Sequence, residues 1–76
     1  MNEPVVNGIY QHYKGHHYVV IALAIHSETL EPVVVYQALY GNKQMWVRPL
    51  SMWNDIVTNK CGKKVKRFEY KAIKGE

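Results

Sequence analysis

The chain has 76 residues, of which 47% are hydrophobic and 21% are charged, a composition typical of globular proteins. A chain of this length is expected to form a single domain over residues 1–76. The apolar run at residues 18–25 is far shorter than the roughly 18 residues of a membrane-spanning helix. The first residues do not resemble a signal peptide, and the single cysteine excludes an internal disulfide. These features predict a cytoplasmic protein that does not enter a membrane.

The net charge of +4 is distributed unevenly along the chain. From residue 60 onward, seven basic and two acidic residues give +5, whereas three basic and four acidic residues give −1 before it. A basic segment attracts phosphate backbones, so nucleic-acid binding is one alternative function. Its candidate residues are Lys60, Lys63, Lys64, Lys66 and Arg67. The competing interpretation is a solvated end that keeps the protein soluble.

Short segments rich in β-branched and aromatic residues alternate with turn signals along the whole chain. After a loose lead-in over residues 1–7, strands are predicted at residues 8–15, 17–26, 33–40, 44–48 and 65–72. Ser51 is a good N-cap and predicts one short helical turn near residues 51–57. Gly62 is expected to act as the pivot of a loop over residues 59–63, and residues 69–76 form a basic C-terminal end.

This pattern predicts an all-β fold in which about five strands form a small, strongly bent barrel. The absence of further helical segments excludes parallel strands joined by crossover helices. The second strand fits a curved sheet, because one of its faces is bulky and the other is small in the middle. The bulky face consists of Val19, Ile21, Leu23 and Ile25.

The chain contains several distinctive blocks, which include Gly8-x-Tyr10-x-His12-Tyr13-Lys14-Gly15, His26-Ser27-Glu28-Thr29-x-Glu31, Trp46-Val47-Arg48-Pro49 and Arg67-Phe68. These blocks resemble a bacterial family named domain of unknown function 1653. The resemblance covers roughly residues 8–68 and leaves out the basic end. It implies an SH3-like barrel, in agreement with the strand pattern, and it implies no activity.

A polar loop at residues 26–31 stands between two strongly apolar strands and is the leading candidate for a binding site. Together with nearby aromatic residues and an arginine, it predicts a non-enzymatic module that binds a peptide or a small polar ligand. The candidate residues are His26, Ser27, Glu28, Thr29, Glu31, Tyr36, Trp46, Arg48 and Trp53. The alternative is an internal network in which Arg48 pairs with Glu28 or Glu31 and only holds the loop.

Catalysis and metal binding are weaker alternatives for the same loop. Neighbouring residues of a strand point to opposite faces, so His26 cannot readily activate Ser27, and no glycine-rich segment offers an oxyanion hole. A further alternative is a small enzyme that uses His26 with Glu28 or Glu31. The four histidines lack the paired spacing of zinc sites and Cys61 is alone, so neither metal nor cofactor is predicted. A site formed by His12 and His26 with one of these glutamates is the remaining metal alternative. An exposed edge strand or a tryptophan patch could also form a dimer, so the oligomeric state stays open.

Overall fold

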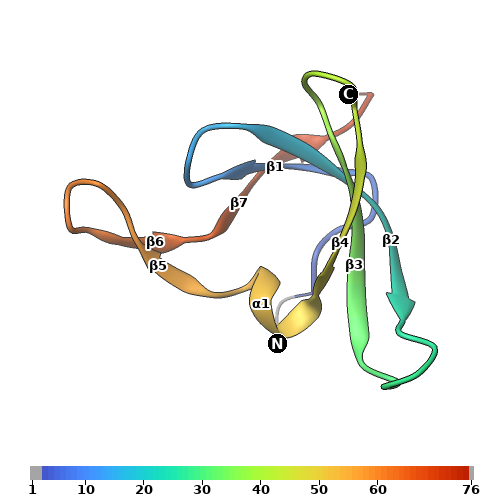
Figure 1. Ribbon diagram of the computed structural model, residues 1–76. Helices are drawn as coiled ribbons and strands as arrows, with labels where there is room; N and C mark the ends of the chain where they lie inside the picture. Colours follow the sequence, from blue (N-terminus) through green and yellow to red (C-terminus); the bar gives the residue numbers. More distant parts are fainter. Residues whose placement is uncertain (1–2, 76) are drawn as a thin grey trace.

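The structure is a computed structural model and describes residues 3–75. This part of the chain forms seven strands in two antiparallel sheets and one short helix (Figure 1). In chain order the elements are β1 (Gly8–His12), β2 (His17–Ile25), β3 (Pro32–Ala38), β4 (Met45–Pro49), α1 (Leu50–Trp53), β5 (Ile56–Thr58), β6 (Lys64–Lys66) and β7 (Phe68–Ile73). The predicted all-β class with one short helical turn is therefore confirmed.

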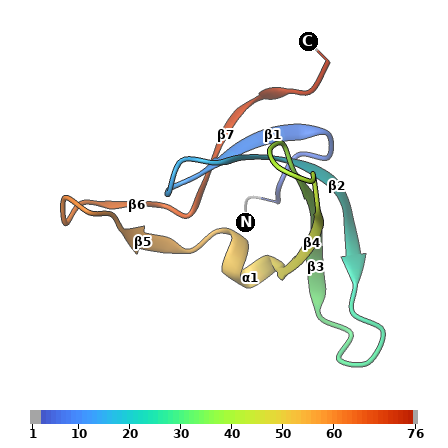
Figure 2. The same cartoon turned by 45° about the horizontal axis from the view of Figure 1, so that its top comes forward.

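The larger sheet has the strand order β4-β3-β2-β1-β7, and β5 pairs with β6 as a separate ribbon. The sheet curves but stays open, because its edge strands β4 and β7 do not pair with each other. The small, strongly bent barrel predicted from the sequence is therefore an open, curved sheet. At Pro49 the chain leaves β4 for α1 and the ribbon, which lie on the open side of the curved sheet (Figures 1 and 2). These elements occupy the side where a closed barrel would join its first and last strands.

A β-bulge in β2 changes which side chains share a face. Val20 pairs with Tyr36, but Ala22 pairs with Val35, so Ile21 is the extra residue. A bulge of one residue reverses the alternation of side chains beyond it. Val19 and Leu23 consequently lie on opposite faces, and the single bulky face predicted for this strand does not exist.

The core is an aromatic cluster on the concave side of the large sheet. Trp53 from α1 is 1% exposed and stacks on Phe68 of β7, with ring centroids 3.8 Å apart and ring planes 4° apart. Tyr10 and Tyr36 meet the Trp53 ring edge-on at 5.4 Å and 5.0 Å, an arrangement that aromatic quadrupoles favour. Val20, Val34 and Leu50 complete this cluster. The helix thus connects the two edge strands of the sheet, because it follows β4 in the chain and its Trp53 packs on Phe68 of β7.

Local boundaries after β4 differ from the prediction. The helix begins at Leu50, so Ser51 lies inside it, and the N-cap position is Pro49 without a side-chain bond. The helix ends at Trp53 because the chain enters β5, which the sequence pattern assigned to helix or loop. The last predicted strand is divided at Arg67, whose N–H donates to the Asp55 carbonyl at 2.9 Å. The Arg67 carbonyl accepts the Tyr13 N–H at 2.9 Å and fixes the base of the ribbon to β1.

The segment before β1 is attached to the sheet by backbone hydrogen bonds. The Val5 N–H donates to the Tyr10 hydroxyl at 2.8 Å, and the Asn7 N–H donates to the Val20 carbonyl at 2.7 Å. The Asn7 carbonyl accepts the Lys74 N–H at 2.8 Å, which joins the two ends of the described chain. Within residues 3–75, no helix has the length and apolar character needed to cross a bilayer.

Candidate functional site

Three of the predicted binding residues gather on the concave side of the sheet, at its β4 edge. Tyr36 is the cross-strand partner of Trp46, and Val34 is the partner of Arg48. Paired residues of an antiparallel ladder point to the same face, so Trp46 and Arg48 share the face of the buried Tyr36 and Val34. Trp46 is 47% exposed, and Arg48 is partly buried. The edge of the core is therefore formed by one exposed indole and one guanidinium.

Arg48 is held by aromatic groups rather than by a carboxylate. Its Nε donates to the Tyr36 hydroxyl at 3.4 Å, and its guanidinium carbon lies 5.6 Å from the Phe68 ring centroid, within the range of a cation–π contact. Within residues 3–75, the ion pairs are Arg67–Asp55 at 3.4 Å and Lys71–Glu69 at 3.3 Å. The charge of Arg48 is left without a carboxylate partner in this part of the chain.

Two tyrosines extend this surface toward the turn between β3 and β4. The Tyr18 and Tyr40 hydroxyls are 2.8 Å apart and share a hydrogen bond, and the Tyr18 ring meets Tyr36 edge-on at 5.3 Å. Burial, then the hydrogen bond with Tyr40, raises the pKa of Tyr18 to about 12. Its hydroxyl therefore stays neutral and can donate or accept a hydrogen bond. We refer to Tyr18, Tyr36, Tyr40, Trp46 and Arg48 as the Arg48 face.

His12 lies beside this face, close enough to several cations for their charge to affect its pKa. Its ring meets Phe68 edge-on at 5.0 Å and Tyr18 at 6.4 Å. Burial lowers the pKa of His12, and the charges of Arg48, Arg67, Lys14 and His16 lower it further. Cations that disfavour protonation of His12 favour a bound anion by the same Coulombic interaction. The chemistry available at the Arg48 face is thus recognition of an anionic group next to an aromatic surface.

This arrangement predicts a pH dependence of stability. The folded-state pKa of His12 lies below its ordinary value of 6.5, so the unfolded chain binds the proton more readily. The contribution of neutral His12 to the free energy of unfolding is fully present above about pH 6.5. This contribution decreases as the pH falls toward the folded-state pKa. Urea unfolding at a series of pH values should show this loss, and His12→Gln should remove it. An unchanged slope in His12→Gln would assign the pH dependence to other groups.

The polar loop predicted as a binding element forms its own hydrogen bonds. His26 Nδ1 accepts the backbone N–H groups of Glu28 and Thr29 at 3.1 Å and 3.3 Å. The His26 N–H donates to the Glu31 carbonyl at 2.8 Å, and the Leu30 N–H donates to the His26 carbonyl at 2.8 Å. All residues from 26 to 31 are exposed. The imidazole therefore fixes the turn that joins β2 to β3.

This loop does not meet the other predicted residues. Glu31 precedes Val34, the cross-strand partner of Arg48, by three residues, which is about 10 Å along a strand. The Arg48 side chain contacts Tyr36, which lies farther from the loop than Val34 does. The expected ion pair of Arg48 with Glu28 or Glu31 is therefore wrong. Figure 1 shows the loop at the end of the β2–β3 hairpin, away from the ribbon.

Trp53 and the histidines are also placed differently from their proposed roles. Trp53 is part of the buried core, so it supports the Arg48 face from beneath instead of lining it. His12 lies beside the first residues of β2 and His26 follows the last, so a strand of nine residues, about 30 Å long, separates them. In the described part of the chain, no group of three histidine, cysteine or acidic side chains is arranged to hold a metal ion.

The basic residues from position 60 onward belong mainly to the β5–β6 ribbon and not to a mobile end. Lys60 and Lys63 lie in its turn, and Lys64 and Lys66 lie on β6. Arg67 differs from them because it is partly buried and paired with Asp55. Sequence patterns missed this ribbon because β5 and β6 have only three residues each. They missed Tyr18 and Tyr40 because the contact between them depends on the register of β2 with β3.

The fold and the Arg48 face define a small all-β domain with a cationic, aromatic surface at one edge of an open sheet. Comparisons with known proteins then place it in a family. The chain belongs to the family described as protein of unknown function (DUF1653), whose model matches residues 8–70.

A crystal structure of a member of this family from Bordetella bronchiseptica is similar over nearly the whole chain. The two proteins are 39% identical and superpose with a TM-score of 0.82, and the match covers 95% of this chain and 94% of the other. A comparison with curated proteins gave no significant match. The similar structure supports the all-β fold.

Proposed function

We propose that this domain is a non-enzymatic binding module that holds an extended acidic peptide along β4. The observation that carries the proposal is the partly buried Arg48, which has no carboxylate partner within residues 3–75. A guanidinium in an aromatic environment binds a carboxylate strongly, because little water competes for its donors. A glutamate, an aspartate or a terminal carboxylate of the peptide supplies this group.

The free edge of β4 supports an extended ligand. β4 is the last strand of its sheet, so one side of its backbone has no neighbouring strand. An edge strand can pair with a peptide through main-chain hydrogen bonds, and the side chains around it then select the sequence. Met45, Trp46 and Val47 are all exposed, at 52%, 47% and 61%. A peptide with apolar residues at alternate positions would cover this surface, and one longer than β4 would approach the loop at residues 26–31.

The proposal is tested with two blocked peptides of about five residues, one alternating valine with glutamate and the other valine with glutamine. Amide chemical shifts of the labelled protein report which strand the peptide contacts. We expect β4 amides to shift with the glutamate peptide, and Arg48→Ala to weaken binding about 10- to 100-fold, as for a lost charged hydrogen bond. Lys71→Ala, which removes an exposed cation from β7 at the opposite edge, should have little effect.

Three outcomes would contradict this proposal. Equal binding of the two peptides would show that Arg48 does not read a carboxylate. Shifts confined to β7 would place the ligand at the other edge. Amide chemical-shift changes at Arg48 with acetate or inorganic phosphate, but not with either peptide, would show that the Arg48 face binds small anions instead of a peptide. Dilution experiments with the free protein show whether a second copy occupies the same edge.

A further inference from the structure

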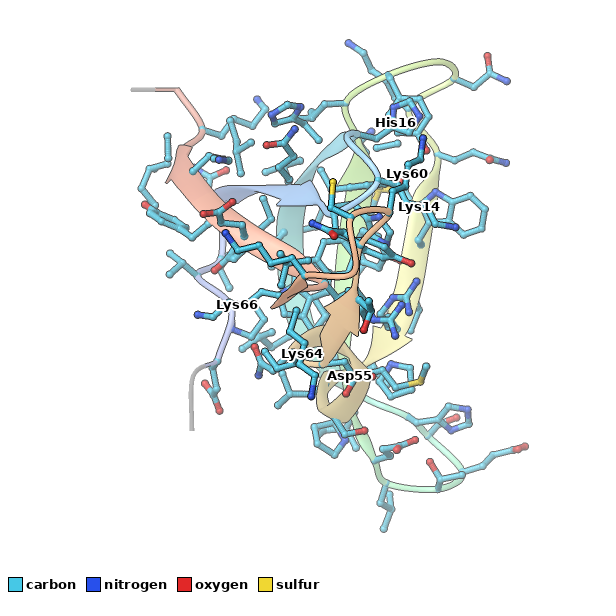
Figure 3. All side chains as sticks on the ribbon, turned by 90° about the vertical axis from the view of Figure 1, so that its left-hand side faces the viewer. Lys14, His16, Asp55, Lys60, Lys64 and Lys66 are labelled. Carbon is cyan, nitrogen blue, oxygen red and sulfur yellow. The ribbon has the colours of Figure 1, made fainter. Side chains whose placement is uncertain are left out.

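Lys60 of the ribbon faces Lys14 across a cleft. Lys14 lies in the turn between β1 and β2, and Lys60 lies in the turn of the β5–β6 ribbon. Figure 3 shows Lys14, His16 and Lys60 near one another and Lys64 and Lys66 farther along the same side of the molecule. Residues from distant parts of the sequence thus place four lysines on one side of the molecule, where Asp55 also lies and pairs with Arg67. We refer to Lys14, Lys60, Lys64 and Lys66 as the basic side.

A cleft of about 860 Å³ separates the two turns. Its lining residues are Tyr13, Lys14, Gly15, Thr58, Asn59, Lys60 and Cys61. This lining contains two cations and no carboxylate. The neighbouring cleft differs, because Glu69 contributes an acidic group to it. The charge of the first cleft therefore favours an anionic ligand.

The lysines of the basic side are available to such a ligand. Within residues 3–75, the carboxylates that form ion pairs are Asp55 and Glu69, and their partners are Arg67 and Lys71. No carboxylate of this part of the chain lies within ion-pair distance of Lys14, Lys60, Lys64 or Lys66. A ligand with several phosphates would release counterions from these side chains on binding.

Aromatic rings at the cleft favour a ligand with bases as well as phosphates. Tyr13 lines the cleft, and the Lys14 ammonium lies 5.9 Å from the centroid of its ring. His16, next to Gly15 of the lining, stacks on Tyr40 with ring centroids 4.1 Å apart. Single-stranded nucleic acids bind where a cationic groove follows the backbone and aromatic rings stack with the bases.

The walls of the cleft are preorganised by hydrogen bonds. Asn59 Oδ1 accepts the backbone N–H groups of Cys61 and Lys63 at 2.9 Å and 3.0 Å, so the turn of the ribbon is fixed. At its other end, the ribbon is held to β1 by the bond from the Tyr13 N–H to the Arg67 carbonyl. The opposite wall turns at Gly15, whose φ of +115° suits glycine. A fixed cleft binds without first having to order its own loops.

From these observations we propose that the cleft binds single-stranded nucleic acid, independently of the site at Arg48. Lys14 and Lys60 contact phosphates across the cleft, Tyr13 stacks with a base, and Lys64 and Lys66 attract the adjoining backbone. The contacts are to phosphates and base faces, so the binding has little sequence preference.

The test is fluorescence anisotropy of a labelled oligothymidine of about twelve nucleotides. Four lysines predict a slope of about −3 for the logarithm of the association constant against that of the salt concentration. This slope corresponds to a loss of about 60-fold in affinity between about 50 and about 200 mM salt. The double variant Lys14→Ala/Lys60→Ala should reduce the slope by about half. Lys71→Ala/Lys74→Ala removes the same charge from the β7 end of the chain and should leave most of the binding.

Two further measurements place the ligand in the cleft. Bound oligothymidine should slow alkylation of the Cys61 thiol, which is exposed at the cleft. Tyr13→Ala should weaken binding at least about fivefold, whereas Tyr13→Phe, which keeps the ring, should not. Thermal melting of each variant shows whether it is folded.

The proposal is overturned if the two double variants lose affinity equally, because net charge alone would then explain binding. It is also overturned if an acidic polypeptide displaces the oligothymidine when both supply the same concentration of negative charge. Absence of oligothymidine binding at the lower salt concentration would overturn it as well. Arg48→Ala should leave this binding intact while it weakens binding of the acidic peptide about 10- to 100-fold. The two proposals can therefore fail separately.

Discussion

Replacement of Trp53 by alanine is expected to lower the free energy of unfolding by about 3–5 kcal/mol. The indole is almost fully buried and contacts rings from β1, β3 and β7, so its removal leaves a cavity between elements that cannot collapse independently. A domain of this length has only about 4–11 kcal/mol of total stability. Urea unfolding followed by circular dichroism should place the midpoint of Trp53→Ala far below that of the wild type.

Trp53→Phe is the matched control for this prediction. It keeps a ring that can stack on Phe68, and it loses no hydrogen bond, since the Trp53 Nε1 atom has no partner within residues 3–75. The phenylalanine variant should therefore be clearly more stable than the alanine variant. Equal destabilisation by both would show that the size of the indole, and not the aromatic stack, determines the packing.

Gly8→Ala is expected to destabilise the domain by about 1–3 kcal/mol through overpacking. A Cβ at this position would lie 2.9 Å from the Val5 carbonyl oxygen, which also accepts the Gly8 N–H. It would approach the rings of Tyr10 and Tyr70 to 3.2 Å and 3.3 Å. The segment before β1 would have to move, and the urea midpoint should decrease.

Gly62 offers a control in which glycine is needed for a different reason. Its φ is +79°, and no atom lies within 4 Å of a Cβ placed there. Gly62→Ala should cost about 1–2 kcal/mol through backbone strain alone, and Gly62→Asn should recover part of the loss. Gly8→Asn should recover nothing, because its side chain is larger still. Recovery in Gly8→Asn would show that the close contact at β1 is not the cause.

Strand positions were predictable because their signals are local. Glycines at 15 and 41 and the proline at 49 mark the turns and the end of a strand, and the structure has boundaries at all three. The division of the last strand at Arg67 was not predictable in this way. It depends on hydrogen bonds to Asp55 and Tyr13, which are distant in sequence. The openness of the sheet likewise depends on where α1 and the ribbon pack.

The candidate site was predictable only in the part that depends on local sequence signals. Trp46 and Arg48 are two residues apart on one strand, so alternation alone puts them on one face. The polar loop attracts attention in the sequence because it stands between two strongly apolar strands, yet His26 uses its acceptor nitrogen for the backbone of its own turn. Trp53 is aromatic and follows an irregular segment, and only its packing on Phe68 shows that it is buried.

The pairing of β1 with β7 has a consequence for the order of folding. β1 to β4 form sequential hairpins, whose contacts close short loops and can form early. β7 joins β1 from the other end of the described chain and brings Phe68 to Trp53. We expect a growing chain to keep this face of its core open until β7 has left the ribosome. Synthesis of β7 would then convert a curved meander into a folded domain in one cooperative step.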